Sequence, residues 1–165
     1  MRFRISFAVA AVATVAAVVG GSSLAATVAS SKTSPFSATY AGRAIVRATS
    51  DIAADINVTG AGKGSVVGVS KITGVGKGFS GEPCATFSGT GTITSKQGRI
   101  NWTLSPGAKS CPSADNADLS AITASAKVTG GTAAFKKARG SFKITGTYDR
   151  GTGRFTSTLK GVISM

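Results

Sequence analysis

The chain has 165 residues, of which 42% are hydrophobic and 15% are charged, and this length suits one domain. It has 19 Lys and Arg residues against 6 Asp and Glu residues, a formal net charge of +13, and no His. Without His, catalysis by Ser-His-Asp or Cys-His arrangements, His-ligated metal sites and His-based pH switches are excluded. Two Cys residues are too few for a four-thiolate zinc site. We therefore expect no catalytic residues, no metal site and no cofactor.

The amino terminus has the pattern of a secretory signal peptide. Arg2 and Arg4 precede Ile5–Val19, an uncharged apolar stretch of fifteen residues that is short for a membrane span of about 20 residues. Small residues follow, which is typical of a cleavage site. We predict a signal peptide over residues 1–25, with cleavage as late as residue 29. The protein is then expected to be secreted or extracytoplasmic.

Export changes how the two cysteines are interpreted. Cys84 and Cys111 lie 27 positions apart in a chain predicted to reach an oxidising compartment. One disulfide between them is the natural expectation, because no His is present to activate a free thiol. Residues 26–35 are expected to form a flexible segment and residues 36–165 the folded domain.

The predicted domain has the alternation of β-strands. In Arg99–Leu104 and Ser141–Tyr148, apolar residues occupy every second position, which indicates strands with one buried face. Runs of this kind predict strands near 36–48, 51–59, 63–73, 85–95, 99–104, 119–129, 140–149 and 154–164. The expected fold is all-β: a single antiparallel β-barrel of about eight strands, with a β-sandwich as the alternative. Closure into a barrel would remove exposed sheet edges.

The connections carry turn residues. Lys96–Gly98 and Asp149–Gly153 each separate two alternating runs and predict hairpins. Residues 105–118 contain two Pro and several small polar residues and are expected to form a long loop. Thr132–Arg139 is the one stretch that suits a helical turn, which Gly140 would end.

A Gly-Lys repeat occurs at a spacing of 14 residues, in Thr59–Gly64 and Thr73–Gly78. It lacks the first Gly of a phosphate-binding loop, and Gly follows each Lys where that loop requires Ser or Thr. No helix is predicted to follow and present its N-terminus to an anion. We interpret the repeat as two successive strands of similar design with exposed lysines.

One turn resembles a known family. The stretch from Val128 to Gly140 is similar to the GGTG-x-F-x-x-A-x-G segment of dirigent and allene-oxide-cyclase-like proteins, and Ala133 stands where that family has its third Gly. The matching residues are Gly130, Gly131, Thr132, Phe135, Ala138 and Gly140. The resemblance implies an eight-stranded barrel and a homo-oligomer, often a trimer. Small exported bacterial proteins share a similar pattern, and we expect this turn to be structural.

Positive charge is concentrated toward the C-terminus. From Leu119 onward there is a single acidic residue, Asp149. The basic residues of this stretch form the candidate basic surface: Lys127, Lys136, Lys137, Arg139, Lys143, Arg150, Arg154 and Lys160. Such a surface would attract an anionic envelope polymer or lipid headgroups, although charge that serves only solubility is the alternative. Nucleic acid is not an expected partner, because the aromatic residues fall on the inward register instead of forming stacking platforms.

Two classes of function fit these observations. The favoured one is an exported, non-catalytic β-barrel that contacts an anionic polymer or membrane, or that holds a small apolar ligand. The alternative is a cyclase- or isomerase-like enzyme that uses a barrel pocket, an analogy from fold. That alternative needs an inward polar group among apolar neighbours, for which Tyr40, Asp55 and Asn101 are the candidates.

Overall fold

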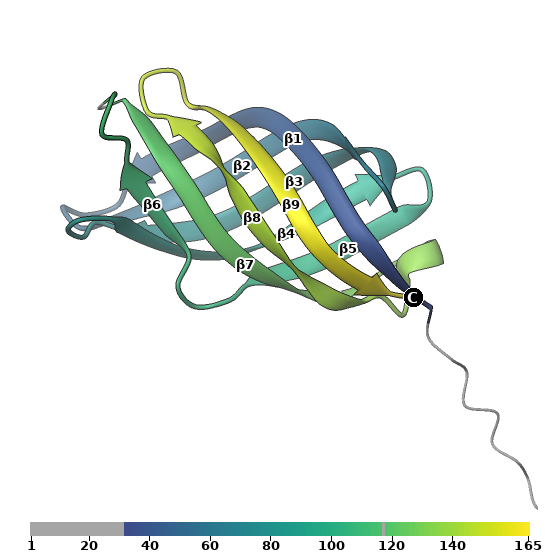
Figure 1. Cartoon of the computed structure of the whole chain (residues 1–165). Coiled ribbons are helices and arrows are strands. Elements are labelled where there is room, and N and C mark those ends of the chain that lie inside the picture. The colour runs from purple at the N-terminus through teal and green to yellow at the C-terminus, as the bar shows by residue number, and fades with distance from the viewer. Residues whose placement is uncertain (1–31, 117) are drawn as a thin grey trace, which may run out of the picture. The chain divides into compact units, whose positions relative to one another are not determined.

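Alternating residues form nine antiparallel strands in the computed structural model, which describes residues 32–116 and 118–165 (Figure 1). The predicted signal peptide lies outside the described residues. The elements are β1 (Thr33–Ala48), β2 (Ala53–Gly64), β3 (Gly68–Phe79), β4 (Ala85–Ser95), β5 (Gly98–Leu104), β6 (Lys109–Pro112), β7 (Leu119–Gly131), the 3-10 turn η1 (Ala133–Phe135), β8 (Arg139–Asp149) and β9 (Arg154–Ser164).

The sheet closes on itself. Its strand order is β3-β2-β1-β9-β8-β7-β5-β4, and the pairing of β3 with β4 joins the two ends. The fold is thus a closed eight-stranded antiparallel β-barrel with one extra strand, and the barrel prediction is confirmed. Closure leaves every long strand with two hydrogen-bonded neighbours, which removes the sheet edges that would otherwise invite pairing with other chains.

The prediction of one long loop at 105–118 is wrong in part, because residues 109–112 form the extra strand β6. Lys109–Pro112 pairs with Ala85 and Thr86 of β4 and with Ser120–Thr123 of β7, so it continues the position that β5 leaves after Leu104. Four residues rich in small side chains carry little alternation of their own. The strand exists because β4 and β7 offer free backbone groups at that position, and only the tertiary structure supplies them.

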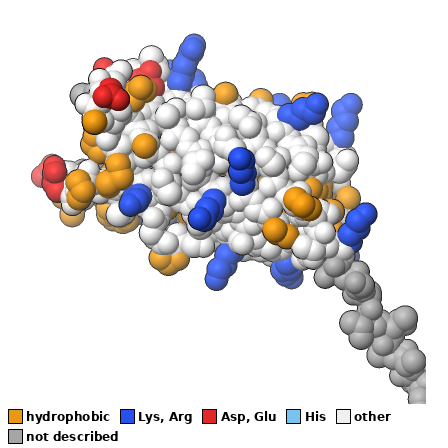
Figure 2. All heavy atoms as spheres, in the orientation of Figure 1, with side chains coloured by type: hydrophobic (Ala, Val, Ile, Leu, Met, Phe, Trp, Pro, Cys, Tyr) orange, Lys and Arg blue, Asp and Glu red, His pale blue; other side chains and the backbone are white. Residues whose placement is uncertain are grey.

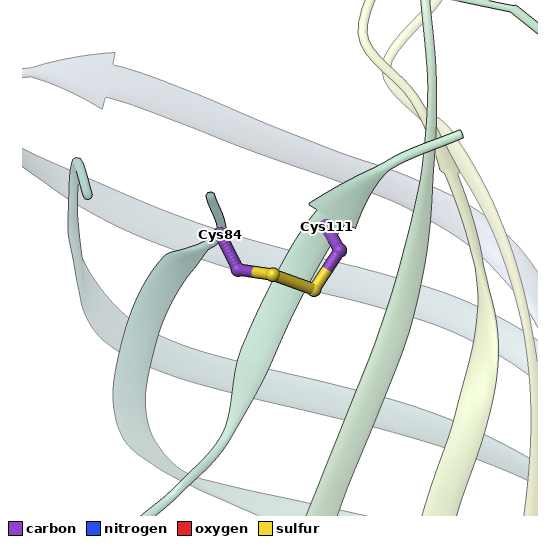
Figure 3. Close-up of a disulfide and its surroundings, with 2 residues drawn as sticks. All are labelled: Cys84 and Cys111. Carbon is purple, nitrogen blue, oxygen red and sulfur yellow. A yellow bond between two sulfur atoms is a disulfide. The ribbon is translucent and has the colours of Figure 1, made fainter. Parts of the chain in front are cut away.

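The disulfide prediction is confirmed. Cys84, immediately before β4, is bonded to Cys111 of β6 (Figure 3). The bond joins two neighbouring segments that few ladder hydrogen bonds connect, because β4 and β6 share only two residue pairs. It therefore anchors the shortest strand to the barrel.

The Gly-Lys repeat lies on β2 and β3, as predicted, but the turn between the two strands lies later in the sequence than the prediction has it. The expected strands end at 59 and begin at 63, which puts a turn at residues 60–62. In the structure β2 continues to Gly64, residues 65–67 form the turn, and β3 begins only at Gly68. Gly62 lies inside β2, and a side chain there would clash with the Thr39 carbonyl oxygen of β1, so Gly serves close strand packing at this position instead of a turn. Val67 in the true turn is buried.

One half of the barrel interior is packed. Phe36, Phe142 and Trp102 form an aromatic layer, with ring centroids 5.5 Å apart for Phe36–Phe142 and 6.2 Å for Trp102–Phe142. Phe135 and Ala138, from the turn between β7 and β8, are fully buried at that end. We call this the closed half; it carries the β2–β3, β4–β5 and β7–β8 turns. The other end is the mouth half.

The turn that resembles dirigent proteins differs in detail from the helical turn expected over Thr132–Arg139. The helical part is the single 3-10 turn η1, and Gly140 lies inside β8, which begins at Arg139. Its φ of 134° explains why Gly stands there, since a side chain would also meet the Val162 carbonyl oxygen at 2.1 Å. Phe135, in the short β7–β8 connection, is buried.

Candidate ligand-binding cavity

The mouth half of the barrel contains an open cavity of about 790 Å³. Inward side chains of alternating strands line it, because every second residue of each strand faces the barrel axis. Its lining is mostly apolar, and Ile72, Trp102, Ile144, Phe155 and Leu159 lie where the cavity meets the packed half. A cavity of this size and character suits a small organic molecule.

The mouth has an apolar lip. Val46, Ile52 and Phe79 line the cavity and are 47%, 65% and 44% exposed. Figure 2 shows hydrophobic side chains gathered at this end of the molecule, on the left of the view. Exposed apolar groups at the entrance of an apolar cavity let an apolar molecule enter without first crossing a polar barrier.

One cation is held at the mouth. Arg150, in the turn between β8 and β9, lines the cavity and donates its Nε–H to Oγ of buried Ser120 at 3.0 Å. The turn is itself braced, because the Thr152 backbone N–H donates to Oδ1 of Asp149 at 3.0 Å, and this hydrogen bond lowers the pKa of the Asp149 carboxyl. Asp51 and Glu82 also line the mouth, so the entrance carries both signs of charge.

Trp102 is the only Trp in the chain and belongs to the cavity wall. Its side chain is 8% exposed, and its indole Nε1–H is buried with no acceptor among the described residues. The ring fits because Gly91 on β4 lacks a side chain; a Cβ there would lie 2.1 Å from Trp102 Cζ2. A buried donor without an acceptor costs about 1–3 kcal/mol.

No protein-family model, curated protein or solved structure matches this chain.

The three residues predicted as inward polar groups, Tyr40, Asp55 and Asn101, do not share one orientation. Tyr40 faces inward and is buried, and its hydroxyl is 2.8 Å from Oγ of Ser70. Burial raises the pKa of Tyr40, and the hydrogen bond with Ser70 opposes that rise. Tyr40 is nevertheless absent from the cavity lining. For Asp55 and Asn101 the expectation is wrong, because both face outward: Asp55 pairs with Lys77 at 3.0 Å, and Asn101 accepts a hydrogen bond from Thr92.

The turn residues 130–140 lie at the end of the barrel opposite the mouth. Thr132 exchanges hydrogen bonds with Arg99 of β5: the Thr132 backbone N–H donates to the Arg99 carbonyl, and Thr132 Oγ1 accepts from the Arg99 backbone N–H. Phe135 and Ala138 are buried in the closed half. This arrangement assigns the turn a structural task, to seal the barrel.

The candidate basic surface is divided between the two ends. Lys143 and Lys160 stand directly opposite each other on β8 and β9, and Lys127 lies nearby on β7. Lys136, Lys137 and Arg139 lie at the closed end, whereas Arg150 and Arg154 lie at the mouth. Sequence reasoning missed that further basic residues from β1 to β5 join the closed half. This grouping depends on which strand ends meet at each end of the barrel, and the strand pattern alone does not give the strand order.

Few features point to metal chemistry or to a membrane span. In residues 32–116 and 118–165, no three His, Cys, Asp or Glu side chains lie together as metal ligands would. Nor does any helix of that part of the chain have the length and apolar character to cross a bilayer. The Cys84–Cys111 disulfide is compatible with an extracytoplasmic location.

Proposed function

We propose that this protein is an exported, non-catalytic binding protein that holds a small apolar molecule in the mouth half of its barrel. The open apolar cavity of about 790 Å³ carries the proposal. Pockets of this volume bury most of a ligand of drug-like size, and burial of apolar surface is the main favourable term in such binding. The disulfide supports export, since such bonds persist in oxidising compartments.

The position of the ionisable groups supports binding over turnover. A cyclase or isomerase, the alternative suggested by the dirigent-like turn, would need a polar group that faces inward among apolar neighbours. The ionisable residues that line the cavity are Asp51, Glu82, Arg150 and, beside them, Tyr148, and all four lie toward the mouth. They are placed to meet a polar end of a ligand or solvent.

Fluorescence offers a direct test, because the single Trp lies in the cavity wall. The neutral apolar dye N-phenyl-1-naphthylamine should bind and accept energy from Trp102, which quenches the Trp emission. Ser157 faces inward and lines the cavity, so Ser157→Phe should fill part of the space and weaken dye binding at least tenfold, on the order expected for lost apolar burial.

The matched control is Thr156→Phe, which adds the same ring to the outward face of β9 and should leave dye binding unchanged. Circular dichroism checks that both variants fold. Absence of energy transfer in the unmodified protein would refute the proposal, as would equal dye affinity in the two variants. Native mass spectrometry of protein recovered from its host would then identify a retained ligand.

A further inference from the structure

Negative charge is confined to one end of the barrel. All six Asp and Glu side chains of the chain lie in the mouth half, in or beside its loops; they are Asp51, Asp55, Glu82, Asp115, Asp118 and Asp149. In Figure 2 the acidic side chains that are visible gather at the left end, the mouth, whereas Lys and Arg spread over the body and the right end. Basic residues accompany the acids in the mouth half, so the charges there largely cancel.

The closed half carries only positive side-chain charge among the described residues. Its eleven basic residues are Lys32, Lys63, Lys71, Lys96, Arg99, Lys127, Lys136, Lys137, Arg139, Lys143 and Lys160. The one ion pair in the described part of the chain, Lys77–Asp55, belongs to the mouth half. Lys143 and Lys160 even stand directly opposite each other, which is unfavourable for a cross-strand pair. This arrangement of like charges does not stabilise the barrel, which favours a role in binding an anionic partner.

The cations nearest the closed end of the barrel form a ring around the barrel axis. Lys32 precedes β1, Lys63 is at the end of β2, Lys96 is in the β4–β5 turn, and Lys136 and Lys137 follow η1. All five are exposed. A flat surface that meets the barrel end-on can contact the whole ring at once, whereas a linear polymer would need the cations aligned along a groove.

Exposed apolar residues lie among these cations. Val69, directly opposite Lys63 in the β2–β3 pairing, is 78% exposed. Val162 on β9 is 47% exposed; Lys160 lies two residues before it on the same strand, and Arg139 lies on the neighbouring strand β8. Apolar side chains gain free energy at the boundary between headgroups and acyl chains, but not against a hydrated polyanion. The mixture of cations and valines therefore favours a lipid surface over a polymer.

We propose that the closed half of the barrel docks end-on onto a bilayer that contains anionic phospholipids, so that the mouth of the cavity faces away from the bilayer. Attraction between each Lys or Arg and the anionic surface supplies the affinity, and the near-neutral mouth with its carboxylates sets the orientation. This proposal stands apart from ligand binding, because it needs no occupant in the cavity.

Vesicle binding tests the proposal with two variants of equal charge. The protein recovered from its host should sediment at low ionic strength with vesicles of phosphatidylcholine and phosphatidylglycerol, and not with vesicles of phosphatidylcholine alone. The closed-end variant Lys63→Gln, Lys96→Gln, Lys136→Gln should bind about a hundredfold more weakly, at about fivefold per charge. The mouth variant Arg47→Gln, Lys109→Gln, Arg154→Gln should bind as the parent does.

Equal weakening in both variants would overturn the proposal, because net charge alone would then explain binding. It would also be overturned if a soluble polyphosphate bound with the same dependence on the closed-end lysines while vesicles did not bind.

Orientation is tested with Trp introduced at either end. Val69→Trp should shift its emission to the blue on anionic vesicles and be quenched by brominated lipid, whereas Ile52→Trp at the mouth should do neither, each compared with the parent emission of Trp102. The reverse pattern would place the mouth on the bilayer and refute the orientation. Both positions are exposed, so neither variant disturbs the core.

Discussion

At the scale of single residues, Ala133 stands out. It is the one described residue other than Gly with a positive φ, 51°, and it occupies the position at which the dirigent-like pattern has Gly. The left-handed region costs an L-residue about 1–2 kcal/mol, because Cβ crowds the following carbonyl oxygen. The turn tolerates this cost because Phe135, two residues later, is buried in the closed half.

We therefore expect Ala133→Gly to raise the free energy of unfolding by about 0.5–1 kcal/mol, the strain relieved less the extra unfolded-state entropy of Gly. Ala134→Gly, next in the same turn and without a positive φ, should lower it by about 0.5–1 kcal/mol. Urea denaturation of both variants measures the difference. If both substitutions changed stability in the same direction, φ at residue 133 would not be the cause.

At the scale of elements, the weakest position in the barrel is the one that β5 and β6 share. Every other position is filled by one long strand, whereas this one is interrupted at residues 105–108. A backbone hydrogen bond from Phe87 to the Ala108 carbonyl holds the interruption to β4. The strand pattern predicted β5 but not β6, because a four-residue strand that ends in a proline has no periodicity to detect.

Removal of the disulfide should loosen this position first. For the 27-residue separation of Cys84 and Cys111, we expect Cys84→Ala together with Cys111→Ala to lower the free energy of unfolding by about 3–4 kcal/mol in the chain-entropy model. Amide hydrogen exchange should accelerate most at residues 109–111. The parent protein treated with reductant should match the double variant; unchanged thermal stability in both would contradict the prediction.

At the scale of the whole molecule, charge and packing divide the barrel in the same direction. The half that is packed carries Lys and Arg but no Asp or Glu side chain, and the half that is hollow carries all six Asp and Glu side chains. Repulsion among the closed-half cations opposes folding, and dissolved salt screens it within a Debye length of about 8–10 Å at physiological ionic strength.

The melting temperature should therefore rise by a few degrees when sodium chloride is raised from low to physiological concentration, the shift expected for about 1 kcal/mol in a domain of this size. The gain should be smaller in the closed-end triple variant than in the mouth triple variant. Scanning calorimetry measures both. A melting temperature that falls with salt would show that attractive pairs dominate instead.

The eight long strands, the barrel class and the disulfide could be predicted from the sequence, because period-two alternation is a local property and the chain has only two cysteines. The sequence pattern misplaced the β2–β3 turn, since Gly60 and Gly62 suggest a turn when their close strand neighbours are unknown. Only the tertiary structure decided that Asp55 faces outward and that half of the interior is hollow. Cavity volume and the grouping of charges depend on which strands meet across the barrel. That pairing is set when the barrel closes, and no single segment of the sequence encodes it.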